Sequence, residues 1–162
     1  MTITQDRLKD LFDYEPETGK LVWRNCARDY MNGREAGVIN NRGYRYIRID
    51  GVMRLAHRLV WLREFGTEPV NIDHVNRVKT DNRLCNLREA TRQQNNANRP
   101  MAKKKSGLPH GVQRVSYSKT YRASIKVNHK SIHLGSFATP DEAREAYRKA
   151  ALHHFGEFAL VA

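Results

Sequence analysis

Four polar residues of types that bind hard metal ions or accept a proton lie close together between positions 73 and 95. They are Asp73, His74, Asn86 and Asn95. An imidazole has an ordinary pKa near 6.5, so His74 can take a proton from water at neutral pH. The carboxylate of Asp73 is a hard oxygen ligand suited to Mg²⁺. These residue types predict a site that activates water beside a divalent metal ion.

Phosphodiester hydrolysis needs a base, a cation that stabilises the developing charge, and a rigid frame that holds both. We expect His74 to be the base, with Asp73 and Asn95 as oxygen ligands that leave positions open for water and phosphate. The metal would be Mg²⁺ or Mn²⁺. Because neighbouring strand residues point to opposite faces, Asp73 and His74 can serve together only if the strand bends there.

The overall charge of the chain indicates a polyanionic partner. The net charge is +12 over 162 residues, with a pI near 10.0, and both halves of the chain are basic. Such an excess favours nucleic acid, and a merely well-solvated surface is the simpler alternative. No run of about 18 apolar residues suits a membrane span, and the N-terminus lacks a signal-peptide pattern. We expect a cytoplasmic protein with no membrane partner.

Hydrophobic periodicity and end signals predict the elements that must position these groups. Helices are expected over residues 4–12, 56–65, 91–98 and 139–154. Strands are expected over 20–24, 44–49, 52–55, 71–73 and 84–87, and a turn over 14–19. After a linker rich in Lys, Pro and Gly, three further strands are expected over 111–115, 121–127 and 131–137. The predicted domains are therefore 1–99 and 111–162, joined by a basic linker over 100–110.

The pattern D-H-x-N…D-N-R-x-x-N-L-R-x-x-T…Q-N-x-x-N-R resembles the HNH nucleases of the ββα-metal class, especially phage homing endonucleases. The upstream run GYRYIRIDGVMRLAHRLVWLREFG extends the likeness over nearly all of residues 10–100. The resemblance implies that His74 is the general base, that Asp73 and Asn95 bind the metal, and that Asn86 holds the loop between two strands. Many HNH enzymes have a histidine in place of Asn95, a departure that disfavours tight zinc binding.

Other polar residues near this motif have more than one interpretation. Asn96 replaces Asn95 as the ligand if the helix register differs by one position. The pair Asp81–Asn82 is interpreted as loop structure. His57, at the start of an expected helix, is interpreted as a structural residue or a phosphate contact rather than a catalytic one.

Residues 111–159 resemble the Apetala-2 or ethylene-response-factor DNA-binding domain. The matching points are Gly-Val at 111–112, Arg-Ala-x-Ile at 122–125, Leu-Gly-x-Phe at 134–137 and Gly-Glu-Phe-Ala at 156–159. The resemblance implies a three-stranded sheet in the DNA major groove with a helix packed behind it, and a strand ribbon fits that groove. The base contacts do not transfer, because Gln113, Tyr121 and His133 depart from the residues usual in the family.

We expect DNA contacts from several residues of this second part and its linker. Lys103–Lys105 are expected to contact phosphate, with solubility alone as the alternative. The candidates are Arg114, Tyr117, Arg122, Lys126, Lys103, Lys104 and Lys105.

Together these patterns predict an α+β chain: an N-terminal ββα-metal HNH nuclease domain, then a three-stranded antiparallel sheet packed on one helix. The predicted function is site-directed cleavage of double-stranded DNA by a homing-type endonuclease, a phage protein in the host bacterial cell. No small-molecule cofactor is expected, and no protein partner is indicated. A non-enzymatic DNA-binding regulator with an inactive HNH fold is the main alternative, and an RNA-binding protein is a weaker one.

Overall fold

The computed structural model describes residues 3–99 and 106–160. The chain forms two compact units, within residues 1–90 and 91–162, and each is described by itself. Lys103, Lys104 and Lys105 lie outside the described residues, so their expected phosphate contacts stay a prediction. No helix in the described part of the chain is long and apolar enough to cross a membrane.

The first unit begins with a short helix and a hairpin and continues into a three-stranded sheet. Helix α1 (Gln5–Leu11), capped by the Thr4 side chain, leads directly into β1 (Phe12–Glu15), which pairs antiparallel with β2 (Lys20–Trp23). A 3-10 turn, η1 (Asp29–Met31), precedes β3 (Val38–Ile39), β4 (Arg45–Ile49) and β5 (Val52–Leu55), which form a sheet in the order β3-β4-β5. Helix α2 (Ala56–Phe65) follows and ends at Gly66 in the left-handed conformation.

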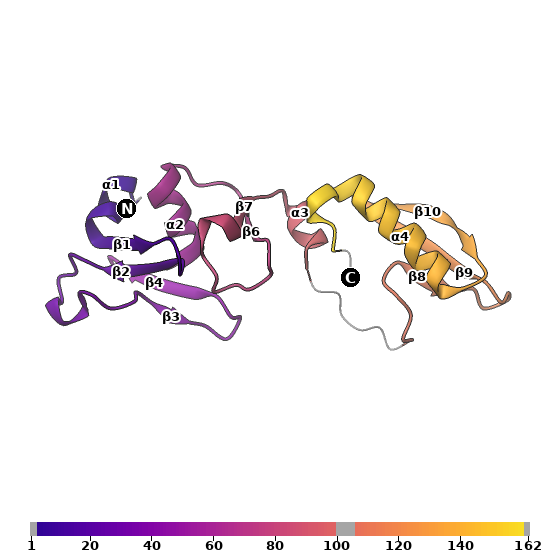
Figure 1. Ribbon diagram of the computed structural model, residues 1–162, viewed down its shortest axis with the longest axis horizontal. Coiled ribbons are helices and arrows are strands. Elements are labelled where there is room, and N and C mark those ends of the chain that lie inside the picture. Colours follow the sequence, from indigo (N-terminus) through magenta and orange to yellow (C-terminus); the bar gives the residue numbers. More distant parts are fainter. Residues whose placement is uncertain (1–2, 100–105, 161–162) are drawn as a thin grey trace. The chain divides into compact units, whose positions relative to one another are not determined.

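The segment that carries the predicted catalytic residues is a second, shorter hairpin. Strand β6 (Ile72–His74) pairs antiparallel with β7 (Leu87–Glu89), and a long loop joins them through the 3-10 turn η2 (Leu84–Asn86). In this register Asp73 is opposite Arg88 and His74 is opposite Leu87. Asp73 and His74 therefore lie on one short strand at the mouth of the loop. Figure 1 shows the β6–β7 hairpin and its loop.

Both hairpins share one hydrophobic core. Phe12, Leu8, Ile47, Leu59 and Val60 are among its fully buried side chains, and Ile72 of β6 and Leu87 of β7 pack into the same cluster. Burial of this apolar area is the main force that holds the short β6–β7 hairpin in place, because a two-stranded hairpin alone is marginal in water.

The first hairpin also supports the loop between β6 and β7 through polar contacts. The hydroxyl of Tyr14 donates to the Asn82 carbonyl at 3.2 Å and accepts from the Leu84 N–H at 3.1 Å. Gly19, with a φ of +72°, lies so close that a Cβ there would be 2.3 Å from the Arg83 nitrogen. Residues separated by more than 60 positions thus determine where this loop lies.

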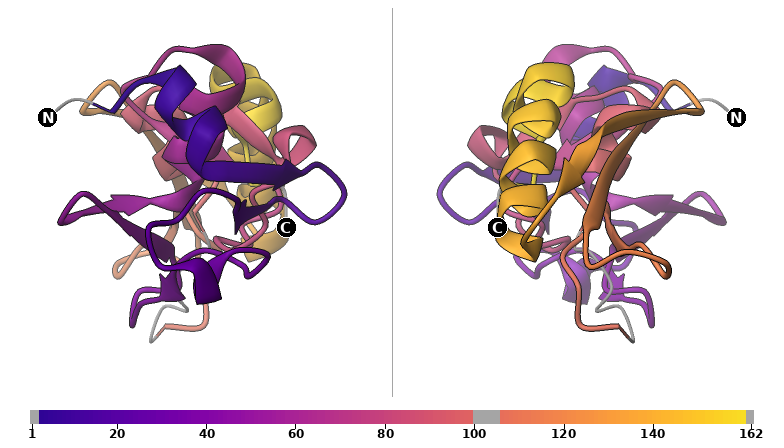
Figure 2. Two further views of the ribbon diagram at one scale, coloured as in Figure 1. Left: turned by 90° about the vertical axis from the view of Figure 1, so that its left-hand side faces the viewer. Right: turned by 90° about the vertical axis from the view of Figure 1, so that its right-hand side faces the viewer.

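The second unit contains a helix, a meander and a longer helix. Helix α3 (Arg92–Ala97) begins with a capping box between Thr91 and Gln94. Strands β8 (Val112–Arg114), β9 (Tyr121–Val127) and β10 (Lys130–Phe137) form an antiparallel sheet in the order β10-β9-β8. Helix α4 (Pro140–Phe155), also started by a capping box, covers one face of this sheet (Figures 1 and 2) and leads into η3 (Gly156–Phe158).

Small residues allow α4 to lie close to the sheet. Ala143 of α4 packs against Ala123 and Val112 in the core of the unit, with Phe137 and Leu134 at its edge. The turn between β9 and β10 is tight, because Asn128 and His129 both have positive φ values, the pattern of a two-residue hairpin turn. The three strands and the helix expected for this part of the chain are confirmed.

Three expectations for local structure were wrong. Residues 14–19 were expected to be a turn, but β1 extends to Glu15 because it pairs with β2. The strand expected over 84–87 begins only at Leu87, since residues 84–86 form η2 instead. The expected elements also omitted η1 and the two-residue strand β3. The unit division at 90/91 groups α3 with the C-terminal part, so the domain limits 1–99 and 111–162 stay a prediction.

We predict that Gly19→Ala destabilises the first unit more than Gly33→Ala does. Both glycines have left-handed φ values, so each substitution costs ~1–2 kcal/mol of backbone strain. At Gly19 the new Cβ would also meet the Asn82–Arg83 backbone, whereas nothing lies within 4 Å at Gly33. Such overpacking typically adds ~1–3 kcal/mol. Urea unfolding of both variants measures the difference, and equal losses of stability would contradict this close contact.

Candidate active site

His74 is a buried side chain held by a hydrogen bond to another buried side chain. It ends strand β6, and its Nε2 lies 3.1 Å from Oδ1 of Asn82, which is 2% exposed. An amide oxygen can only accept a hydrogen bond, so Nε2 carries the proton in this pair. The basic lone pair of the neutral ring is therefore on Nδ1. The sequence did not identify Asn82 as part of the site, because only the folded loop brings it back to His74.

Asn86 ties together the loop that lies between His74 and β7. Its Oδ1 accepts from the Asn76 N–H, and its Nδ2 donates to the Asp81 carbonyl, both at 2.8 Å. The Asp81 carboxylate in turn accepts from the Arg83 guanidinium at 2.7 and 2.8 Å and from the Asn76 side chain at 2.7 Å. One buried amide thus connects both ends of the loop.

Asp73 is buried and paired with the residue opposite it on β7. Nε and one terminal nitrogen of Arg88 donate to Oδ2 of Asp73 at 3.0 and 2.8 Å. The pair is well shielded from solvent, so its geometry is better defined than that of a surface ion pair. Arg88 therefore sets the orientation of the carboxylate that the sequence predicts as a metal ligand.

Two aromatic side chains lie against the His74 ring. The His57 ring, from the first turn of α2, is 5.1 Å away at 80°, and the Tyr44 ring is 6.2 Å away at 53°. His57 and Tyr44 are 5.6 Å apart, which closes a cluster of three rings. Lys79 of the loop lies 4.7 Å over the Tyr44 ring. The cluster joins the β6–β7 loop to α2 and to the start of β4.

Burial favours the neutral form of both histidines. It lowers the pKa of His57 to about 3, with further lowering by His74 and then by Arg58. Burial also lowers the pKa of His74, against the raising effects of the Asn82 hydrogen bond and the Asp73 and Asp81 charges. A neutral imidazole at pH 7 is the form that a general base requires.

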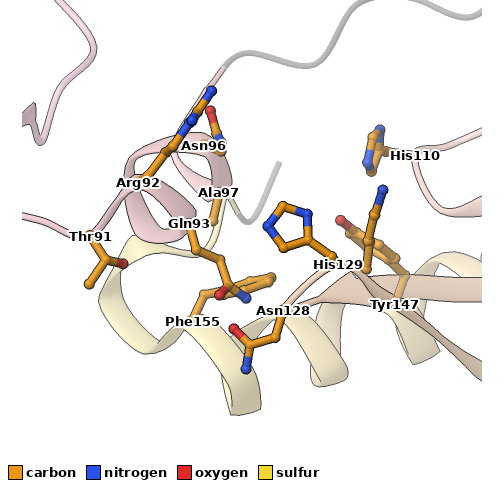
Figure 3. Close-up of a pocket in the computed structure, with 11 residues that line it drawn as sticks. Thr91, Arg92, Gln93, Asn96, Ala97, His110, Asn128, His129, Tyr147 and Phe155 are labelled. Atoms are coloured by element: carbon orange, nitrogen blue, oxygen red, sulfur yellow. The ribbon is translucent and has the colours of Figure 1, made fainter.

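Asn95 lies on α3, in the second compact unit, and is half-buried. Its convergence with Asp73 on one metal ion therefore stays a prediction. Asn96, the alternative ligand, lines a different space, a cavity of about 830 Å³ within the second unit. Arg92 and Gln93 of α3 line the same cavity, and Figure 3 shows the Gln93 side chain extending toward Asn128. Whether Asn95 or Asn96 is the ligand stays a prediction.

Only some of the residues expected to contact DNA share a face of the second unit. Alternation along β9 puts Arg122 and Lys126 on the face opposite α4, and both are exposed. Arg114 pairs with Tyr121, which packs against the core on the α4 side of the sheet. Arg114 therefore lies on the face toward α4 and not on the face that carries Arg122 and Lys126. Tyr117 is 85% exposed in the loop between β8 and β9.

The Arg122–Lys126 face contains two more polar residues that the sequence did not single out as contacts. Gln113 of β8 pairs with Arg122, and His133 of β10 pairs with Ser124, so both lie on the same face. Residues that are paired across neighbouring strands lie on the same face of a sheet. The sequence could have indicated Gln113 and His133 only if the strand register had been known.

We predict that His57→Phe weakens the pH dependence of stability. In the unfolded chain the imidazole binds a proton as the pH falls below 6.5, whereas in the folded protein it stays neutral until about pH 3. Protons therefore favour the unfolded state in this range, and the free energy of unfolding falls as the pH drops. Urea unfolding between pH 7 and 4 should show a smaller fall for the variant. Parallel curves for the two proteins would contradict a buried, neutral His57.

Comparison with known proteins finds a similarity over this segment. A family model described as HNH endonuclease matches residues 54–97. Over 90 residues, 56% of this chain, the sequence is 33% identical to an uncharacterized HNH endonuclease of Acanthamoeba polyphaga mimivirus. The match covers 46% of that relative, so the chain spans less than half of its length. No solved structure matches significantly. The segment that is similar to this family includes Asp73, His74, Asn86 and Asn95.

Proposed function

We propose that this protein is a site-directed endonuclease of the homing type that hydrolyses double-stranded DNA. Cleavage uses one divalent metal ion and His74 as the general base. The observation that carries the proposal is the buried pair of Asp73 and His74, with Nε2 of His74 held by Asn82. This pair lies in the segment that matches the HNH endonuclease family.

In this proposal, Nδ1 of His74 takes a proton from the water that attacks the scissile phosphorus. The hydrogen bond from Nε2 to Asn82 supports this role, because it keeps the proton on Nε2 and so places the basic lone pair on Nδ1. It also stabilises the imidazolium that forms, since Asn82 accepts a stronger bond from a charged donor. Asn86 acts indirectly, by holding the loop that carries Asn82 and so keeping His74 aimed.

The donor set fits a hard divalent cation with open coordination. Among the described residues, no three His, Cys, Asp or Glu side chains gather in a way that could hold a metal ion. One carboxylate and one amide instead suit Mg²⁺ or Mn²⁺, which keep several water or phosphate oxygens as ligands. Asp73 and Asn95 would hold the ion, and Arg88 keeps the Asp73 carboxylate oriented. When bound, the ion neutralises charge on the phosphate and the leaving oxygen.

The second unit anchors the enzyme on DNA. Arg122 and Lys126 present two positive charges on one exposed sheet face, together with the polar side chains of Gln113 and His133. A three-stranded sheet of this kind can lie in the major groove, where arginine reads guanine or contacts phosphate. Tyr117 and Arg114 lie outside this face and contact the flanking backbone in this proposal.

A non-enzymatic DNA-binding regulator that keeps an inactive HNH fold is the alternative. The intact set of Asp73, His74 and Asn86, with the base held in one tautomer, favours the enzyme. A regulator has no need to bury both an ion pair and a hydrogen-bonded imidazole in this short strand. The cleavage assay below separates the two.

We predict that His74→Ala lowers the rate of Mg²⁺-dependent DNA cleavage by about 10²–10⁴-fold, because a general base contributes that much. DNA affinity should change less than about twofold, since the substitution leaves the second unit intact. Nicking of supercoiled plasmid, with EDTA as a blank, measures the rate. His153→Ala, which removes an exposed histidine from α4, is the matched control. Cleavage by His74→Ala at the wild-type rate would contradict the assignment of the base.

We predict that Arg122→Ala combined with Lys126→Ala weakens DNA binding and flattens its salt dependence. Each lost phosphate contact should reduce the slope of log K against log salt by about 0.9. The matched control combines Arg144→Ala with Lys149→Ala, which removes the same charge from exposed positions on α4. Fluorescence anisotropy from 50 to 200 mM salt measures both slopes. Equal slopes in the two double variants would exclude this sheet face from the interface.

A further inference from the structure

A lysine of the β6–β7 loop is held beside the rings that surround His74. Nζ of Lys79 donates to the Arg42 carbonyl at 2.9 Å and lies 4.7 Å from the centre of the Tyr44 ring. A cation within about 6 Å of an aromatic ring is attracted to its face, so the two contacts together place the ammonium. The Tyr44 ring also lies against the His74 ring, with their centres 6.2 Å apart. One tyrosine thus contacts both the ammonium and the proposed general base.

The Lys79 ammonium keeps capacity for a further ligand. An ammonium has three N–H donors, and the Arg42 carbonyl takes one of them. In the part of the chain that the structure describes, Lys79 forms no ion pair. The acid nearest to it along the loop, Asp81, already accepts from Arg83 and Asn76. Because the Lys79 side chain is exposed, an anion from solution can reach it.

Arg42 supplies a second cation at the same place. It lies in the turn between β3 and β4, where the Asn40 side chain accepts from the N–H groups of Arg42 and Tyr44 at 3.0 and 3.1 Å. These bonds fix the turn, and the Arg42 carbonyl joins it to Lys79. The Arg42 side chain is exposed and, among the residues that the structure covers, also forms no ion pair. Two loops from distant parts of the sequence therefore bring two uncompensated cationic residues next to the cluster of three rings.

A purely structural role does not account for a charge at position 79. Joining the two loops requires only a donor to the Arg42 carbonyl, which a neutral amide would supply. A second positive residue beside the first adds repulsion and not attraction. A lysine side chain also loses much rotamer freedom when it is held in place. The charge is useful only if it meets an anion from outside the chain.

A phosphate of the DNA strand is the anion that fits this place. In the proposed function the scissile phosphorus lies close to His74, and each strand of a duplex carries one phosphate per about 3.4 Å of helix axis. A cation beside His74 therefore meets a neighbouring phosphate of the same strand. An ammonium binds a phosphate oxygen as a point charge, whereas a guanidinium binds two oxygens as a fork.

We propose that Lys79 and Arg42 form a phosphate-binding site of the first unit, which holds the strand to be cut beside His74. The site contacts a neighbour of the scissile phosphate and takes no part in the chemical step. The inference rests on the proposed function, because that function makes DNA the substrate. It adds a contact to DNA from the first unit, separate from the sheet face of the second unit.

Neutralising the site in the full-length protein tests the inference. A double variant, Lys79→Gln with Arg42→Ala, removes both charges, while the glutamine amide can still donate to the carbonyl of residue 42. In EDTA its affinity for a fluorescent DNA duplex should fall about tenfold, and the slope of log K against log salt should fall by about 0.9. In plasmid nicking with Mg²⁺, KM should rise about tenfold and kcat should stay within about threefold, because equal binding of ground and transition states affects KM alone.

Two further variants are the controls. Lys79→Arg keeps the charge and should keep most of the affinity. Lys9→Ala with Arg28→Ala removes one lysine and one arginine from exposed positions of the same unit, on α1 and before η1, and should leave the salt slope unchanged. Urea unfolding shows whether each variant is folded under the assay conditions.

The place of the phosphate is tested with duplexes in which single phosphates around the mapped nick are replaced by uncharged methylphosphonates. A replacement next to the scissile phosphate should weaken binding by the wild type and leave the double variant unaffected, because the charges that it would meet are already absent. Equal responses of the two proteins at every position near the nick would show that the site does not hold the strand beside His74.

An unchanged salt slope in the double variant, an equal fall in the control with Lys9→Ala and Arg28→Ala, or a loss of kcat at unchanged KM would each overturn the inference. A loss of stability at unchanged DNA affinity would leave Lys79 and Arg42 a structural role alone and would overturn it too. If the wild type binds DNA without cutting it, the proposed function fails, and the salt slopes in EDTA still decide the inference. A wild type that does not bind DNA would overturn both.

Discussion

The hydrogen bond between Nε2 of His74 and the Asn82 side chain determines which nitrogen of the buried imidazole can act as a base. Both side chains are buried, so the bond competes little with solvent. It places the proton on Nε2 and the lone pair on Nδ1. The proposed water activation requires this tautomer, and the rest of the first unit contributes by keeping Asn82 in place.

Much of that support comes from parts of the chain far from the motif. Tyr14 and Gly19 of the first hairpin contact the backbone of residues 82–84, and Asn86 connects Asp81 with Asn76. The loop is long and mostly polar, so few apolar contacts of its own hold it. Its order depends on these hydrogen bonds and on the close approach of a glycine. Most of the segment that is similar to HNH endonucleases therefore depends on contacts with residues near the N-terminus.

The sequence predicted the elements with strong local signals and missed those that depend on distant partners. Helix α2 with Gly66 at its end and strand β9 agree with their predicted limits, because periodicity and end signals are local. Strand β1 was missed since its pairing with β2 overrides a turn-like sequence. Spacing singled out Asp73, His74 and Asn86 as candidates, whereas Asn82, His57 and Arg88 are brought to these candidates only by the folded loop, α2 and the register of β7.

The central claim is that Asp73 and Asn95 share one divalent ion beside His74. Titration of ¹⁵N-labelled protein with Mn²⁺ tests it directly, because the paramagnetic ion broadens nuclei close to it. The account predicts that the Asn95 side-chain amide and the His74 imidazole broaden together at the same Mn²⁺ concentration, and that both stay sharp in Asp73→Ala. Broadening of His74 while the Asn95 amide stays sharp, or broadening that persists in Asp73→Ala, would contradict it.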